Sequence, residues 1–151
     1  MMRTIAKSGR TSKTVRPRGA GHPVPGLVLP LLEFDLPAEE RLLHKEDAWN
    51  VISRNAKTLA KYDDMRVVLI AMKAGTRTDG HQTHGSLAIL CLAGKLTVHL
   101  ANTNVEVPAG RLLTLERNLP HDVEALEDST FLLTLSWPRE QMESAEVNMA
   151  A

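Results

Sequence analysis

Apolar and polar positions alternate over short stretches of this chain, and glycine, proline or asparagine separates the stretches. In residues 95–100, Leu96, Val98 and Leu100 share one face of an extended chain and the intervening polar residues share the other. Residues 65–73 are apolar almost throughout, which is typical of a strand covered on both faces. Short strands that recur about every 8–12 residues, with no long helical period between them, predict an antiparallel sandwich or barrel. The expected strands span residues 57–62, 65–73, 87–93, 95–100, 105–107, 111–116, 123–125 and 130–137.

The segment before these strands has a different pattern. Residues 27–34 are apolar but contain Pro30, which favours an edge strand or an extended segment laid against the body. Asp35 followed by Pro37 predicts the start of a short helix, and residues 49–52 are expected to form a further strand. We therefore divide the chain into a disordered basic tail over 1–25, an N-terminal extension over 26–56, a barrel over 57–138 and a polar tail over 139–151.

Charge is unevenly distributed although the formal net charge is zero. Residues 1–18 hold six of the 18 basic residues and none of the acidic ones. Such an arm is either a solvated terminus or a contact to phosphates or anionic lipid, and the first interpretation is favoured. Aromatic residues make up 3% of the chain, too few for a surface that stacks bases, so nucleic acid is not expected as a partner.

The sequence also bears on the compartment. No apolar run approaches the roughly 20 residues that cross a bilayer, and the N-terminus lacks an apolar secretory signal. The arginine-rich start shares features with a mitochondrial transit peptide, but Gly9 and Pro17 interrupt any amphipathic helix there. Cys91, the one cysteine, lies in an apolar run where a buried structural thiol is expected. These features favour a cytoplasmic protein without membrane contact.

Three of the six histidines lie in two segments. His81 and His84 follow Gly75, and His121 follows Gly110. A strand-and-turn region separates the two segments, so we expect them to form two walls of one barrel pocket.

Two other polar residues of this region, His99 and Asp122, are expected to have no ligand or catalytic role. His99 lies on the polar face of residues 95–100 and is expected to be an exposed strand residue. Asp122 has the opposite strand parity to His121, which predicts a surface ion pair and argues against a general base.

The glycines and histidines of this region resemble the two sequence motifs of the cupins, Gly-x5-His-x-His-x3-Glu-x6-Gly and Gly-x5-Pro-x-Gly-x2-His. Gly75, His81 and Gly94 fall in the register of the first motif, and Gly110 and His121 fall in that of the second. Residues 55–59, 120–126 and 131–135 are also similar to small single-domain bacterial cupins of unassigned function. The resemblance implies an all-β fold over residues 57–137, the double-stranded β-helix or RmlC-like jelly-roll barrel, with short helix and strand additions before it.

Several motif positions are replaced. Thr83 stands where the second histidine of the first motif is expected, and Leu87 stands where its glutamate is expected. In the second motif, Glu116 replaces the proline and Asn118 replaces the second glycine. The replacements leave the skeleton of the motifs in place and change their chemistry.

Carried over residue by residue, the resemblance leaves His81 and His121 as metal ligands and places His81, Thr83, Leu87 and His121 in the pocket. His84 completes a three-histidine site for a divalent transition metal (Fe, Mn, Zn or Ni) if a bulge shifts its strand by one residue. Without that shift no metal is expected as a cofactor.

Two functions follow from these alternatives. The first is a small-molecule-binding or sensory cupin-domain protein without a catalytic metal, whose ligand the sequence does not identify. The second is a metal-dependent oxygenase or isomerase that acts on a small organic acid or phenol through His81, His84 and His121. The sequence leaves open whether the protein is an enzyme. We expect a homodimer, because the resemblance implies one and extra strands before residue 57 would offer an edge to a second copy.

Overall fold

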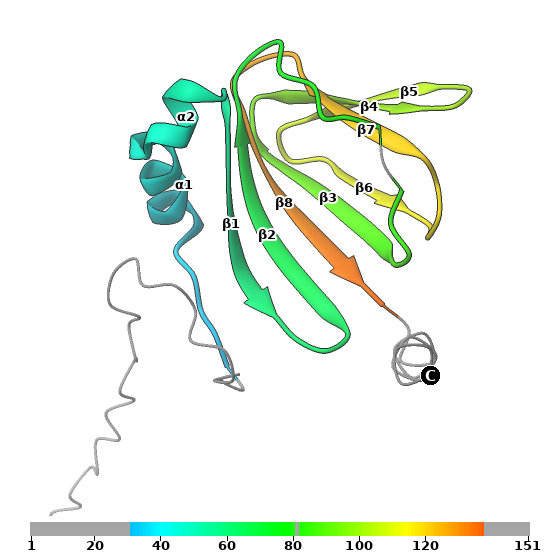
Figure 1. Ribbon diagram of the computed structural model, residues 1–151, viewed down its shortest axis with the longest axis horizontal. Coiled ribbons are helices and arrows are strands. Elements are labelled where there is room, and N and C mark those ends of the chain that lie inside the picture. The colour runs from blue at the N-terminus through cyan, green and yellow to red at the C-terminus, as the bar shows by residue number, and fades with distance from the viewer. Residues whose placement is uncertain (1–30, 81, 138–151) are drawn as a thin grey trace, which may run out of the picture.

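The computed structural model describes residues 31–80 and 82–137. In this part of the chain two helices precede eight strands (Figure 1). The tails expected over 1–25 and 139–151, and His81, lie outside the described residues. The helices are α1 (Leu36–Lys45) and α2 (Asp47–Val51), and the strands are β1 (Arg54–Lys61), β2 (Met65–Met72), β3 (Ser86–Ala93), β4 (Lys95–Leu100), β5 (Asn104–Pro108), β6 (Leu112–Leu115), β7 (His121–Ala125) and β8 (Ser129–Ser136).

The strands form two antiparallel sheets. One has five strands in the order β1-β2-β8-β3-β6, and the other has three in the order β5-β4-β7. The last strand, β8, lies between β2 and β3, so the sheets are built from segments that are distant in the chain (Figure 1). This is a jelly-roll barrel, which confirms the predicted all-β fold. Each of the eight strands expected over residues 57–137 is found within three residues of its predicted limits. Residues 31–34 of the edge strand or extended segment expected over 27–34 form no strand, and residues 27–30 lie outside the described residues.

Aliphatic side chains fill the space between the sheets. From β3, Leu87, Ile89 and Cys91 point inward and are at most 4% exposed, and from β4, Leu96 and Val98 are fully buried. Successive strand residues point to opposite faces, so every second residue enters this core. The apolar face predicted for residues 95–100 is thus the inner face of the smaller sheet.

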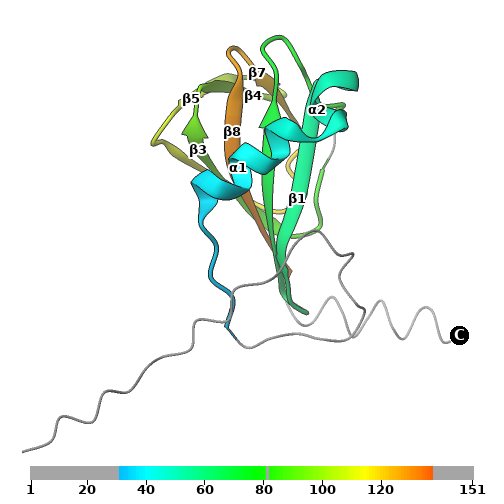
Figure 2. The same ribbon diagram turned by 90° about the vertical axis from the view of Figure 1, so that its left-hand side faces the viewer.

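The helices cover the outer face of β1 and β2 (Figure 2). Leu69 and Ala71 of β2 are fully buried there, together with Leu43 of α1. The alternate residues of β2, such as Ile70 and Met72, pack in the barrel interior. Because both faces of β2 are covered, the strand is apolar almost throughout, as its sequence indicated.

The start of α1 is as predicted. The carboxylate of Asp35 accepts a hydrogen bond from the amide of Ala38 at 3.1 Å, and Pro37 lies in the first turn. Of the helices in the described part of the chain, neither has the length and apolarity that a membrane crossing needs.

The prediction of a strand over 49–52 is wrong, because residues 49–51 belong to α2. The ring of Trp49 packs 4.4 Å from that of His44, and Ser53, with a φ of 58°, turns the chain into β1. Packing of this aromatic pair outweighs the local strand preference of Trp, Val and Ile. Helices thus take the place of the strand expected over 49–52, while residues 54–56 of the extension begin β1, an edge strand of the larger sheet. The homodimer stays a prediction.

A buried asparagine joins the helices to the sheet. The side-chain amide of Asn55 in β1 donates to the carbonyl of Leu43 at 3.0 Å and to the Glu46 carboxylate at 2.8 Å. The Leu43 carbonyl lies in the last turn of α1, where backbone acceptors lack partners within the helix. Asn55 is 8% exposed, so this bond is shielded from water.

Replacing Asn55 with alanine should lower the free energy of unfolding by about 1–3 kcal/mol, because it leaves a buried carbonyl without a donor. Urea denaturation measures the change. Lys57→Ala in the same strand is the control: it removes the Lys57–Glu39 ion pair (2.6 Å) from a lysine that is 43% exposed, and should cost less than about 1 kcal/mol. A loss in Asn55→Ala no larger than in the control would contradict this account.

Candidate functional site

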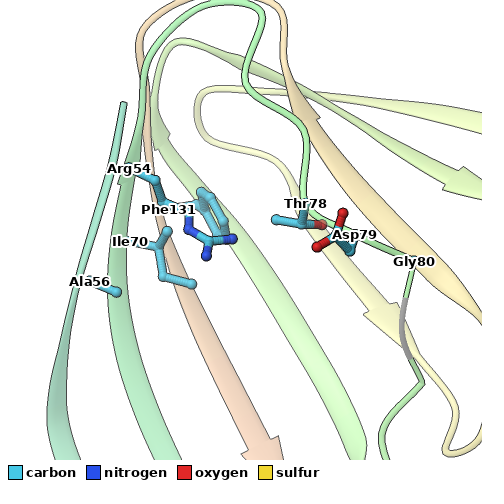
Figure 3. A pocket seen from close by; sticks show the side chains of 7 residues that line it. All are labelled: Arg54, Ala56, Ile70, Thr78, Asp79, Gly80 and Phe131. Atoms are coloured by element: carbon cyan, nitrogen blue, oxygen red, sulfur yellow. The ribbon is translucent and has the colours of Figure 1, made fainter. Parts of the chain in front are cut away.

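A cavity of about 410 Å³ lies on the inner face of the larger sheet. Its lining comes from three strands and from the loop between β2 and β3 (Figure 3). The volume falls within the range of about 300–1,000 Å³ that is typical of small-molecule sites. The lining residues are Arg54 and Ala56 of β1, Ile70 of β2, Phe131 of β8, and Thr78, Asp79 and Gly80 of the loop.

The floor of the cavity is one row of side chains across three adjacent strands. Ala56 is paired with Ile70, and Ile70 is paired with Phe131. Arg54 is paired with Met72, so it occupies the next inward-facing position of β1. The floor is therefore apolar and ends at a guanidinium group.

Hydrogen bonds to β7 hold the facing wall. The amide of Gly75 donates to the carbonyl of Ala125 at 2.8 Å, and the amide of Ala125 donates to the carbonyl of Thr76 at 2.9 Å. The amide of Thr78 donates to the carbonyl of Val123 at 2.9 Å, and its hydroxyl oxygen accepts from the Val123 amide at 3.0 Å. Residues 75–78 thus pair with β7 at the edge of the smaller sheet. The loop residues that follow them lie over the cavity floor.

An ion pair fixes the same loop from the outer side. Nε of Arg77 donates to Oδ1 of Asp122 at 2.7 Å, and Nη2 donates to Oδ2 at 3.0 Å, so the contact is bidentate. The hydrogen bond from Arg77 lowers the pKa of the Asp122 carboxyl below its usual value, and the same bond raises the pKa of Arg77. Asp122 therefore makes the predicted ion pair, and its partner belongs to the cavity loop.

His121, the first residue of β7, is 4% exposed. Its Nδ1 lies 2.8 Å from the carbonyl oxygen of Leu119. A carbonyl only accepts hydrogen bonds, so Nδ1 donates this bond. A backbone carbonyl on one nitrogen is the contact that orients a metal-ligating histidine, and it also suits a histidine that accepts a hydrogen bond from a ligand.

The two replaced ligand positions have other roles. Leu87 is 4% exposed and belongs to the interior core. The hydroxyl of Thr83 donates to the carbonyl of Gly85 at 2.8 Å, inside the loop that leads into β3. One side chain therefore fills the core, and the other bonds to its own loop.

Two of the three predicted histidine ligands, His84 and His121, are among the described residues, and they lie in different surroundings. His84 is exposed in the loop before β3, and the register irregularity of that strand lies between Cys91 and Ala93, away from His84. His81 lies outside the described residues. Within 31–80 and 82–137, no group of three or more His, Cys, Asp or Glu side chains is arranged to hold a metal ion. The described residues thus supply the buried His121 and the exposed His84 without joining them in such a group.

His99 lies on the outer face of β4 but is less exposed than expected. Nε2 is 2.7 Å from the Glu124 carboxylate, and Nδ1 is 2.9 Å from the amide oxygen of Asn104. The side chain is 18% exposed, because these strand neighbours cover it. Its ring nitrogens are thus held in contacts outside the barrel.

Cys91 lies on the inner face of β3, paired with Phe131. Its Sγ is 3.5 Å from the carbonyl oxygen of Ala93 and 3.7 Å from that of Gly94. Burial raises the pKa of the thiol above its usual value. The predicted buried structural thiol is confirmed.

Most residues of the cavity are not foreseen from the sequence. One signal is present: Arg54 and Ala56 occupy alternate positions of a strand and so share a face. The spacing of residues does not reveal that β1, β2 and β8 lie side by side, and this pairing brings Ile70 and Phe131 together.

No protein-family model matches the sequence, and no curated protein is significantly similar to it. Solved structures do match the fold. A cupin-2 domain-containing protein from Shewanella frigidimarina superposes with a TM-score of 0.57 at 13% identity, over 69% of this chain and 94% of that chain. The chain therefore has the cupin fold, and the resemblance seen in the motifs is confirmed at this level.

Two further structures illustrate the range of proteins built on this fold. The cupin-2 domain of an XRE family transcriptional regulator from Enterobacter cloacae has a TM-score of 0.53 at 14% identity, over 58% of this chain and 99% of that chain. A mutant of salicylate 1,2-dioxygenase from Pseudoaminobacter salicylatoxidans has a TM-score of 0.64 at 13% identity, over 74% of this chain and 36% of that chain. At such identities the likeness extends to the fold alone.

Replacing Asp122 with asparagine should loosen the cavity loop. We expect the amides of Gly75 and Thr78, which bond to the backbone of β7, to exchange with solvent about 2- to 5-fold faster near neutral pH, on the scale of a surface ion pair. Hydrogen exchange followed by NMR measures this. Glu106→Gln is the matched control, because it removes the Lys95–Glu106 pair (2.9 Å) of the same sheet without touching the loop.

The effect of Asp122→Asn should depend on pH. The pKa of Asp122 is lowered in the folded protein, so the ion pair stabilises fully above the usual aspartate pKa of about 3.9. Its contribution is lost as the pH falls through the lowered value. The exchange rates of wild type and variant should then converge in acid; equal rates already at neutral pH would show that the pair does not hold the loop.

Proposed function

We propose that this chain is a small-molecule-binding cupin-domain protein whose ligand occupies the cavity between the larger sheet and the β2–β3 loop. The cavity itself carries the proposal, since its 410 Å³ combine an apolar floor with polar groups at the rim. Sites of this kind bury the apolar body of a ligand and orient it through a few polar contacts. Backbone hydrogen bonds already tie the loop to β7, which reduces the ordering cost of binding.

The proposed binding needs no catalytic metal. Leu87, at the position of the family's glutamate ligand, has no donor atom and is packed in the core. The hydroxyl of Thr83, at a histidine position, is engaged within its own loop. A module that binds its ligand unchanged suits a sensory role, and the fold also occurs as a domain of a transcriptional regulator.

Filling the cavity should abolish binding. Ala56 faces the cavity beside Ile70, so Ala56→Phe places a ring over the floor. We expect fragments that bind the wild-type protein in ligand-observed NMR to lose at least about tenfold in affinity in this variant, because the apolar floor is no longer accessible.

Ala101→Phe, in the exposed turn after β4, adds the same ring away from the cavity and serves as the control. It should bind the fragments like the wild type. Thermal unfolding checks that both variants are folded. A fragment library that yields no ligand sensitive to Ala56→Phe would refute the proposed function.

The alternative is a metal-dependent oxygenase or isomerase with His81, His84 and His121 as ligands. The observation in its favour is the His121 ring, which is buried and oriented by the hydrogen bond from Nδ1 to the Leu119 carbonyl. A metal there would supply Lewis acidity or oxygen activation. We place this function second because Thr83 and Leu87 stand at two of the family's ligand positions.

Metal analysis separates the two functions. Under the proposal, protein purified without an affinity tag contains Fe, Mn, Zn and Ni well below one equivalent, and His121→Ala leaves these contents unchanged. His99→Ala is the control, since His99 lies on the outer face of the barrel. A stoichiometric metal that is lost in His121→Ala and His84→Ala but kept in His99→Ala would establish the alternative.

A further inference from the structure

Arg54 is the basic residue of the cavity lining. Among the described residues it makes no ion pair, whereas Lys57, Arg77 and Lys95 each contact a carboxylate within 3 Å. Its side chain lies on the inner face of β1 and lines the cavity. A guanidinium group that has no ion-pair partner among residues 31–80 and 82–137 and is directed into a ligand-sized cavity is available to an anion.

The surroundings of Arg54 favour an organic anion. The floor next to it consists of Ala56, Ile70 and Phe131, which offer only hydrocarbon surface. Arg54 is exposed, and the apolar wall excludes water from one side of a contact that an anion makes with it. The planar guanidinium fork matches a carboxylate with two parallel hydrogen bonds.

A second charge limits which anions fit. Asp79 lines the cavity from the loop side, and Figure 3 shows its carboxylate on the other side of the cavity from Arg54. The far end of a ligand that lies on the floor approaches this carboxylate. A second negative charge at that end is repelled, whereas a neutral end is accepted.

We propose that the cavity binds a small monocarboxylic acid, with its carboxylate on Arg54 and its apolar body on the row of Ala56, Ile70 and Phe131. This inference rests on the proposed function and specifies its ligand class. Asp79 selects against dicarboxylates. No covalent step is involved.

The test uses three monocarboxylates, butyrate, benzoate and hydrocinnamate, each beside its own amide, and benzylsuccinate as a dicarboxylate. Affinities of the full-length protein are measured by NMR titration at neutral pH. At least one acid should bind about tenfold or more tightly than its amide, which has the same shape without the charge. Benzylsuccinate should bind more weakly than hydrocinnamate.

Variants assign this preference to Arg54. Arg54→Gln should weaken binding of the preferred acid about 10- to 100-fold and leave its amide almost unchanged, since a hydrogen bond to a charged group is lost. Arg54→Lys keeps the charge but not the fork and should lie between the two. Arg111→Gln, at an exposed arginine before β6, should bind like the wild type.

The outcomes separate this inference from the proposed function. Equal binding of every acid and its amide, or an acid preference that survives Arg54→Gln, overturns the carboxylate assignment. If neutral fragments are still lost in Ala56→Phe, the cavity remains a binding site and only the assignment fails. If no ligand of either kind is sensitive to Ala56→Phe, the proposed function fails with it.

Discussion

The structure depends on the burial of β2 on both of its faces. Outward-facing Leu69 and Ala71 pack under the helices, and inward-facing Ile70 forms the centre of the cavity floor. Protein interiors are close-packed, so a change in the outer layer is transmitted through this strand to the inner one. The helices α1 and α2 therefore contribute to the stability of the site, although no residue of either helix lines the cavity.

Much of the fold could be read from the sequence, and much of the site could not. Alternation in residues 95–100 and the apolar run of β2 predicted strands because those segments obey a local rule of burial. The prediction of a strand over residues 49–52 was wrong because the contact between Trp49 and His44 decides their conformation. The alternation of apolar and polar residues gives no sign of this contact. The row from Ala56 to Phe131 depends on register between distant segments, and one sequence contains no measure of register.

Backbone conformation limits which residues can occupy the motif glycine positions, but it does not limit the motif ligand positions in the same way. Gly75, Gly94 and Gly110 have φ values of 81°, 79° and 84°, a region that L side chains rarely adopt. Asn118, which replaces another motif glycine, has a φ of 61°, and asparagine tolerates that region better than other non-glycine residues. Thr83 and Leu87 have no positive φ, so the backbone accepts many side chains there. Turns that require particular residues can thus persist while the chemistry of a site changes.

Because Cys91 is buried, the barrel is suited to site-specific labelling through an introduced cysteine. It is the one cysteine of the chain, it is fully buried, and its raised pKa keeps it in the unreactive protonated form. A cysteine introduced at the cavity rim would therefore be the sole accessible thiol, with no native residue to remove first. A fluorophore or spin label placed there would report directly on what enters the barrel.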